Sequence, residues 1–230
     1  MIIHYLPHQN NVQQIGYKLL SMLNFKGKRG EEQGVEVIEK LLESARKMSL
    51  KVLKGVKEID VSIDWTTKTW YGRPVGGLGS SEEGNSWNYA TATTKFNGKV
   101  LLLAFVTQVK GMTKEEIVKA LVEQVVAMGF KIRLITLDAG FYTIDVLNFV
   151  SQFKYIVAVP VGDVKVYEEF DGDYTTNSKR HRRDEQVKFR LLVYSKEKVR
   201  RKSLVYFARA TNLDLPKREV LDLYNKVRVP

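Results

Sequence analysis

The stretch EIDVSIDW, residues 58–65, alternates large apolar residues with polar ones along its whole length. The odd-numbered positions, from Ile59 to Trp65, share one face, and a period of two predicts a strand whose apolar face covers a core. The even-numbered positions form the other face and include Asp64. This strand therefore supplies both a core-forming surface and an acidic side chain.

Two further strands follow it in the chain. Residues 86–96 (SWNYATATTKF) alternate in the same way, and residues 99–109 (KVLLLAFVTQV) are strongly apolar. Between them stands Asn97-Gly98, a pair typical of tight hairpin turns. The first three strands are therefore expected to form an antiparallel meander.

Helices and strands alternate after this meander. Residues 113–116 (TKEE) form a capping box that opens an amphipathic helix, and Gly129 ends it. Residues 131–137 are a compact apolar strand, residues 143–153 a second helix, and residues 154–161 a nearly continuous apolar strand. The order β-β-β-α-β-α-β predicts an α/β fold with a mixed sheet and helices on its faces.

The segments around this core, residues 56–164, have a different character. Residues 1–55 contain helical patterns and are interpreted as a helical N-terminal appendage. Residues 165–210 are interpreted as a basic, β-rich insertion, and residues 211–230 as the start of a returning helical part, with Pro216 at a first helical position. Strand-like stretches in the insertion are 165–169, 186–194 and 203–208.

Composition excludes several classes of protein. The 230-residue chain has no cysteine, which excludes disulfides and thiolate catalysis, and its three histidines leave little for a histidine-rich metal site. No apolar run approaches the roughly 20 residues of a membrane span, and the N-terminus lacks a secretory signal. We therefore expect a cytoplasmic protein that does not bind membranes.

Positive charge is concentrated in one segment. The chain has 37 Lys and Arg against 26 Asp and Glu, a net charge of +11. Residues 179–202 hold eleven basic and three acidic residues, and so carry +8 of that excess. This clustering favours contact with DNA phosphates, although a solvated hairpin on a basic protein is the alternative. The candidate DNA-binding residues are Lys179, Arg180, Arg182, Arg183, Arg200, Arg201 and Lys202.

Two aspartates are the candidates for chemistry. Asp64 lies in the first strand, and Asp138 follows the fourth, just before Gly140. In the predicted order these strands are neighbours, so both carboxylates are expected at one end of the sheet. Two carboxylates at such a short distance repel each other, and they favour a hard cation such as Mg²⁺ or Mn²⁺ between them. Two such ions would suit attack on a phosphodiester.

Structural roles remain open for the same residues. Asp64 could bond the hydroxyl of Thr66 or Thr67, and Asp138 could shape the turn that follows it. Asp60 competes with Asp64, because it lies four residues earlier on the same face of the strand.

Several motifs resemble DDE transposases of prokaryotic insertion sequences, in the retroviral-integrase superfamily. Residues 63–66 (IDWT), 70–72 (WYG) and 88–91 (NYAT) are similar to the first half of that family. Residues 137–142 (LDAGFY) resemble its second acidic motif. The resemblance extends from about residue 56 to the C-terminus.

The resemblance implies a ribonuclease H-like core over residues 56–164, followed by a β-rich insertion. It implies that Asp64 and Asp138 are catalytic and bind Mg²⁺ or Mn²⁺. The implied function is transposition, with metal-dependent cleavage and strand transfer at insertion-sequence ends. The implied partners are double-stranded DNA of the element ends and the target, with a homodimer as one arrangement.

The family's third acidic residue, a glutamate, should follow a segment such as residues 222–228 (DLYNKVR). The sequence ends before one appears, and Glu219 precedes Tyr224 instead of following it. We therefore expect a C-terminally truncated transposase, with two metal ions only if a third carboxylate is supplied. Two alternatives are a catalytically dead DNA-binding remnant and a stand-alone ribonuclease H-like nuclease.

Overall fold

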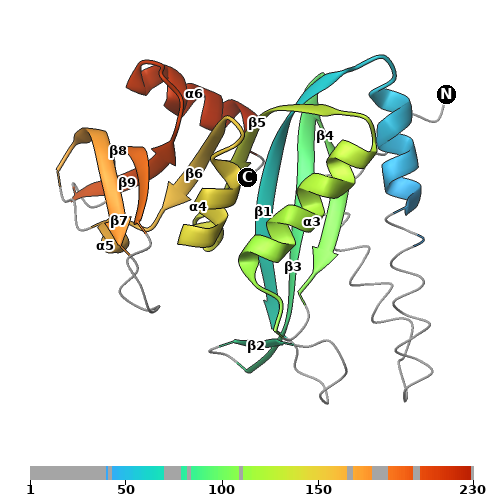
Figure 1. Cartoon of the computed structure of the whole chain (residues 1–230), viewed down its shortest axis with the longest axis horizontal. Helices are drawn as coiled ribbons and strands as arrows, with labels where there is room; N and C mark the ends of the chain where they lie inside the picture. The colour runs from blue at the N-terminus through green and yellow to red at the C-terminus, as the bar shows by residue number, and fades with distance from the viewer. Residues whose placement is uncertain are drawn as a thin grey trace.

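The computed structural model describes residue 40 and residues 43–69, 79–81, 84–108, 111–164, 168–177, 186–198 and 203–228. These residues form a mixed sheet of nine strands with helices on both faces (Figure 1). The strands are β1 (Glu58–Thr69), β2 (Gly79–Ser81), β3 (Gly84–Phe96), β4 (Lys99–Thr107), β5 (Lys131–Leu137), β6 (Tyr155–Val159), β7 (Phe170–Asn177), β8 (Gln186–Lys198) and β9 (Ser203–Thr211). The helices are α3 (Lys114–Ala127), α4 (Ile144–Val150), α5 (Val161–Val164) and α6 (Lys217–Val227), besides helical residues 43–52 and a 3-10 turn over Ala139–Phe141.

The predicted meander is confirmed. β3 pairs antiparallel with both β1 and β4, and the β3–β4 hairpin turns at Asn97 and Gly98. Both turn residues have positive φ angles, 49° and 73°, the backbone that an Asn-Gly turn favours. The short strand β2 pairs with the first residues of β3.

The alternating part of the sheet also follows the prediction. β5 lies parallel to β1, and β6 lies parallel to β5, so the strand order here is β4-β3-β1-β5-β6. The predicted capping box begins α3. The Thr113 hydroxyl accepts from the Glu116 amide at 3.2 Å, and the Glu116 carboxylate accepts from the Thr113 amide at 2.7 Å.

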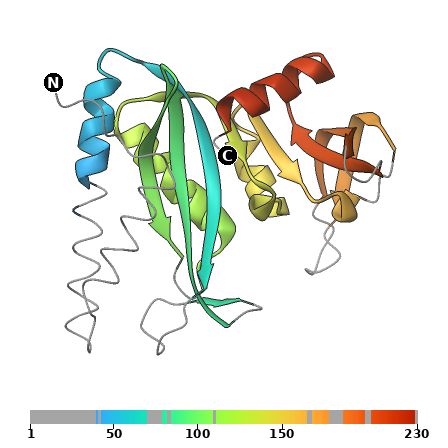
Figure 2. The same ribbon diagram turned by 180° about the vertical axis from the view of Figure 1, so that it is seen from behind.

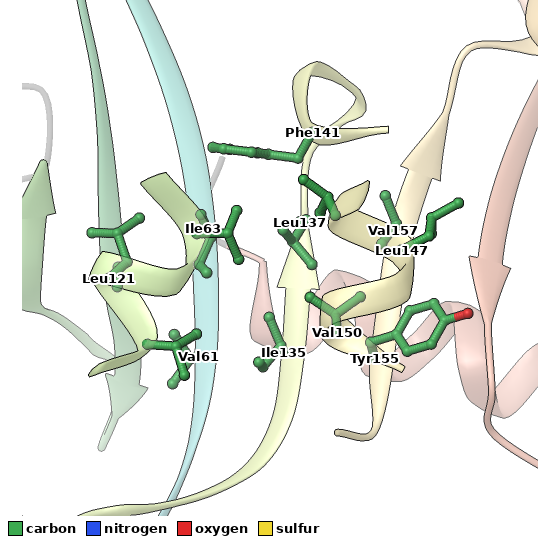
Figure 3. Packing of buried hydrophobic residues seen from close by; sticks show 14 of the residues in the cluster. Val61, Ile63, Leu121, Ile135, Leu137, Phe141, Leu147, Val150, Tyr155 and Val157 are labelled. Carbon is green, nitrogen blue, oxygen red and sulfur yellow. The ribbon is translucent and has the colours of Figure 1, made fainter. Parts of the chain in front are cut away.

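The main core lies between the sheet and the two helices α3 and α4, which cover the near face in Figure 1. Val61 and Ile63 of β1 point into it beside Ile135 and Leu137 of β5 (Figure 3). All four side chains are almost fully buried. Burial of this kind is the main favourable term in folding, and it fixes which face of β1 points to the helices.

A smaller core lies on the opposite face, under α6 (Figure 2). Val220, Tyr224 and Val227 of α6 pack against Leu134 of β5 and Ile156 of β6. Because successive residues of a strand point to opposite faces, the even-numbered positions of β1 face the same side as α6. This arrangement brings the C-terminal end of α6 close to the acidic face of β1.

The second half of the chain differs from the prediction in detail. The sequence predicts a strand over residues 165–169. Glu168 and Glu169 lie outside any strand, so the prediction is wrong for these two residues, and residues 165–167 lie outside the described part of the chain. β7 begins at Phe170 instead, and its extended form depends on pairing with β8, because it has little apolar alternation of its own. β9 pairs antiparallel with β6, so β7, β8 and β9 extend the core sheet. Pro216 is the cap residue before α6, one position earlier than predicted.

In the part of the chain that the structure describes, no helix is both long enough and apolar enough to cross a membrane.

Candidate active site

The two predicted acidic residues lie side by side. Ile63 of β1 is aligned with Leu137 of β5 in the parallel ladder, and each is followed by an aspartate. Since Ile63 and Leu137 point into the main core, Asp64 and Asp138 leave the sheet on the face that α6 covers. The predicted convergence of these carboxyl groups, at the carboxyl end of β5, is therefore confirmed.

Backbone amides hold the carboxylate of Asp138. Its Oδ2 accepts from the amide of Trp65 at 3.1 Å, and its Oδ1 accepts from the amide of Gly140 at 2.8 Å. A Cβ atom at Gly140 would lie only 2.9 Å from Oδ1, so this close approach requires glycine. Asp138 thus shapes the turn, as one alternative predicted, and its orientation is fixed relative to β1.

The environment of Asp64 disfavours its charged form. Burial raises the pKa of Asp64 to about 6, and the charge of Asp138 and a hydrogen bond between the two carboxyl groups act in the same direction. The Arg228 guanidinium opposes this rise of the pKa. Two carboxyl groups that repel each other in a half-buried position are typical of sites that share a proton or a cation.

The competing acid on the same strand has a different role. Asp60 receives a two-pronged ion pair from Arg133, with Arg133 Nε 2.8 Å from Asp60 Oδ1. Arg133 is near the start of β5, at the opposite end of that strand from Asp138. Asp60 is therefore a structural ion-pair partner, and it lies four residues before Asp64 on β1, about 13 Å along the strand.

The C-terminal end of α6 is tied to the same place. The hydroxyl of Tyr224 donates to the carbonyl of Leu137 at 3.5 Å, one residue before Asp138. Arg228 Nη1 donates to that hydroxyl at 2.9 Å, and Lys95 Nζ on β3 donates to the Arg228 carbonyl at 2.6 Å. These contacts explain how Arg228, which follows Asp64 by 164 positions in the chain, affects the pKa of the Asp64 carboxyl group.

Glu219 does not join the acidic pair. It is exposed in the first turn of α6, nine residues before Arg228, which is about 13 Å along a helix axis. Within the described ranges, no three acidic or histidine side chains are grouped so that they could hold a metal ion. The position of a third carboxylate therefore stays a prediction.

An open pocket of about 430 Å³ adjoins Asp138. It lies beyond the carboxyl ends of β5 and β6, the edge where α/β sheets commonly bind ligands. Two cations line it, Arg209 of β9 and Arg228 after α6. Sequence reasoning missed both. The signal for Arg209 is a lone arginine in an otherwise apolar strand, FARA at residues 207–210.

The predicted DNA-binding residues cannot be placed in this geometry. Lys179, Arg180, Arg182, Arg183, Arg200, Arg201 and Lys202 all lie outside the described residues.

Comparisons with known proteins bear on two parts of the chain. A family model described as a domain of unknown function (DUF4322) matches residues 2–52, which precede β1 and the sheet. No curated protein matches the chain. Among solved structures, the chain is similar to piggyBac transposase in a synaptic complex with hairpin DNA, with a TM-score of 0.44 and 13% sequence identity. The similarity covers 74% of this chain and 38% of that one, so the chain spans well under half of the matched protein.

Proposed function

We propose that this protein is a DDE-type transposase that cleaves and joins DNA at the ends of an insertion sequence. The observation that carries the proposal is the side-by-side placement of Asp64 and Asp138 on neighbouring parallel strands. The acidic motifs that resemble the family supply these two residues. The strand order β4-β3-β1-β5-β6, with its antiparallel meander, agrees with the ribonuclease H-like core that the resemblance implies.

The donor set fits a hard divalent cation. Carboxylate oxygens are the ligands that Mg²⁺ and Mn²⁺ prefer. Each oxygen of Asp138 accepts one backbone hydrogen bond and keeps a lone pair for an ion. Asp64 and Asp138 would hold one ion, which when bound lowers the pKa of an attacking water or hydroxyl and neutralises a leaving oxygen. A second ion would need a further carboxylate.

The proposed reaction has two transfers at phosphorus. In the first, water attacks a phosphodiester at the element end, the bond from phosphorus to the 3′-oxygen breaks, and that oxygen takes up a proton. In the second, the freed 3′-hydroxyl attacks a phosphodiester of the target and releases a new 3′-hydroxyl. The amides of Trp65 and Gly140 keep Asp138 oriented throughout, so no reorganisation is needed when charge develops.

The test is nicking of supercoiled plasmid DNA by the full chain with Mn²⁺ or Mg²⁺. We expect nicking that a chelator stops and that Asp138→Asn or Asp64→Asn abolishes. Asp60→Asn is the matched control, because it makes the same chemical change on the same face of β1 but at an ion pair with Arg133. Nicking by Asp138→Asn at the wild-type rate would refute the proposed site.

A DNA-binding protein without catalysis is the second candidate. The observation that favours it is the position of Glu219, at the end of α6 remote from the acidic pair. Under this alternative the wild-type chain binds duplex DNA but does not nick it in either metal. Metal-dependent cleavage without any joined product would instead favour a stand-alone nuclease.

A further inference from the structure

We propose that Arg209 is the centre of a phosphate subsite beside the acidic pair, where it binds a backbone phosphate of the nucleic acid. The identity of the ligand as nucleic acid rests on the proposed function. The existence of an anion site rests on the side chains around the pocket.

The guanidinium of Arg209 is buried with most of its hydrogen-bonding capacity unused. The residue is only 8% exposed. Arg209 Nη1 donates to the carbonyl of Ala208 at 2.7 Å, whereas the buried Nε has no partner in the described structure. A guanidinium has five N–H donors, and leaving buried donors unpaired costs free energy. Such a group is expected to bind an acceptor that the protein itself does not provide.

Aromatic rings hold this guanidinium in place. Its central carbon lies 4.2 Å from the ring centroid of Tyr224 and 5.7 Å from that of Tyr194. Cation–π contacts of this kind offset part of the cost of burying the charge, and they restrict the side chain before any ligand arrives. An arginine stacked on rings keeps its planar fork available, which suits the two oxygens of a phosphate.

The surroundings of Arg209 leave room for an anion and add a second cation. Arg209 and Arg228 both line the pocket of about 430 Å³. Four small residues leave space in its wall: Ala139, Gly140, Ala158 and Ala208. Among the described residues, Arg209 makes no ion pair with a carboxylate. In this part of the chain, no carboxylate therefore neutralises the charge of Arg209 by pairing with it.

The position of the pocket favours a polymer over a small anion. Asp138 belongs both to the acidic pair and to the pocket wall. A strand with one phosphate at the acidic pair would therefore place a neighbouring phosphate in the pocket. The pocket is open to solvent, which allows a chain to enter and leave, and the net charge of +11 attracts polyanions.

The test uses the full chain in chelator, so that no metal contributes, and a fluorescently labelled DNA duplex. Arg209→Gln is compared with Arg133→Gln. This control makes the same change on an exposed arginine of β5, at the end of that strand away from Asp138. We expect Arg209→Gln to weaken duplex binding about tenfold, as expected for one charged hydrogen-bonded contact. The slope of log affinity against log salt should fall by about one, and Arg133→Gln should change neither quantity by as much.

A second measurement keeps the proposal testable if Arg209→Gln fails to fold. Sodium phosphate should raise the melting temperature of the wild-type chain more than sodium chloride of equal ionic strength. In Arg209→Lys, which keeps the charge but loses the planar fork, this difference should shrink. Equal melting temperatures of the wild type in the two salts, or equal duplex binding by Arg209→Gln and Arg133→Gln, would overturn the subsite.

The outcomes separate this inference from the proposed function. Nicking that depends on Asp138, together with duplex binding that is indifferent to Arg209, would overturn the subsite and leave the transposase proposal standing. Phosphate binding that depends on Arg209, in a chain that never nicks DNA, would support the subsite and count against the proposed chemistry.

Discussion

Asp64 destabilises the folded protein whenever its carboxyl group is ionised without a cation nearby. Burial, and then the charge of Asp138, raises its pKa from 3.8 to about 6. The unfolded chain therefore binds fewer protons than the folded protein between these two pKa values, and in the absence of metal this carboxyl group lowers stability as pH rises through that interval. Replacing Asp64 with asparagine removes the ionisation while keeping the size and polarity of the side chain.

The size of the effect follows from the shift. About 2 pKa units correspond to about 3 kcal/mol, and solvent screening of this half-buried group reduces that to about 1–2 kcal/mol. We expect metal-free Asp64→Asn to be more stable than the wild type by about 1–2 kcal/mol near pH 7.5, but by only a few tenths near pH 4. Other titrating groups, such as Glu58 and Glu169 with their lowered pKa values, are the same in both proteins. The difference in stability between the two proteins therefore reports the contribution of Asp64.

Urea unfolding in chelator at both pH values, followed by circular dichroism, measures this difference. Asp60→Asn is the control, and it should lose stability near neutral pH because its ion pair with Arg133 disappears. A raised pKa of Asp64 would be refuted if Asp64→Asn were less stable than the wild type at neutral pH, or if its gain in stability were the same at both pH values.

Two further predictions concern the same site. Mn²⁺ should raise the melting temperature of the wild-type chain by favouring the folded state that holds it, chelator should reverse the rise, and Asp138→Asn should abolish it, as read by scanning fluorimetry. Gly140→Ala should cost about 1–3 kcal/mol of unfolding free energy, because its Cβ would lie 2.9 Å from Asp138 Oδ1. Urea unfolding checks this second prediction, and an unchanged midpoint would show that the turn adapts freely.

Local sequence pattern was sufficient for much of the fold. The alternation in residues 58–65, the Asn97-Gly98 turn and the capping box at Thr113 each depend on residues close in the chain. They predicted the meander and α3 because periodicity and turn chemistry act over short distances. The neighbouring placement of Asp64 and Asp138 followed from element order, since few strand orders accommodate this succession of elements.

Tertiary structure decided the features that depend on register between distant segments. β7 is extended through its pairing with β8, so its own composition did not locate it. Asp60 has a structural role because register brings Arg133 beside it. Arg209 and Tyr224 are brought together by the packing of α6 across the sheet, which no local pattern shows. A contact between segments far apart in the chain leaves no trace in the periodicity of either one, and only the packed sheet and helix reveal it.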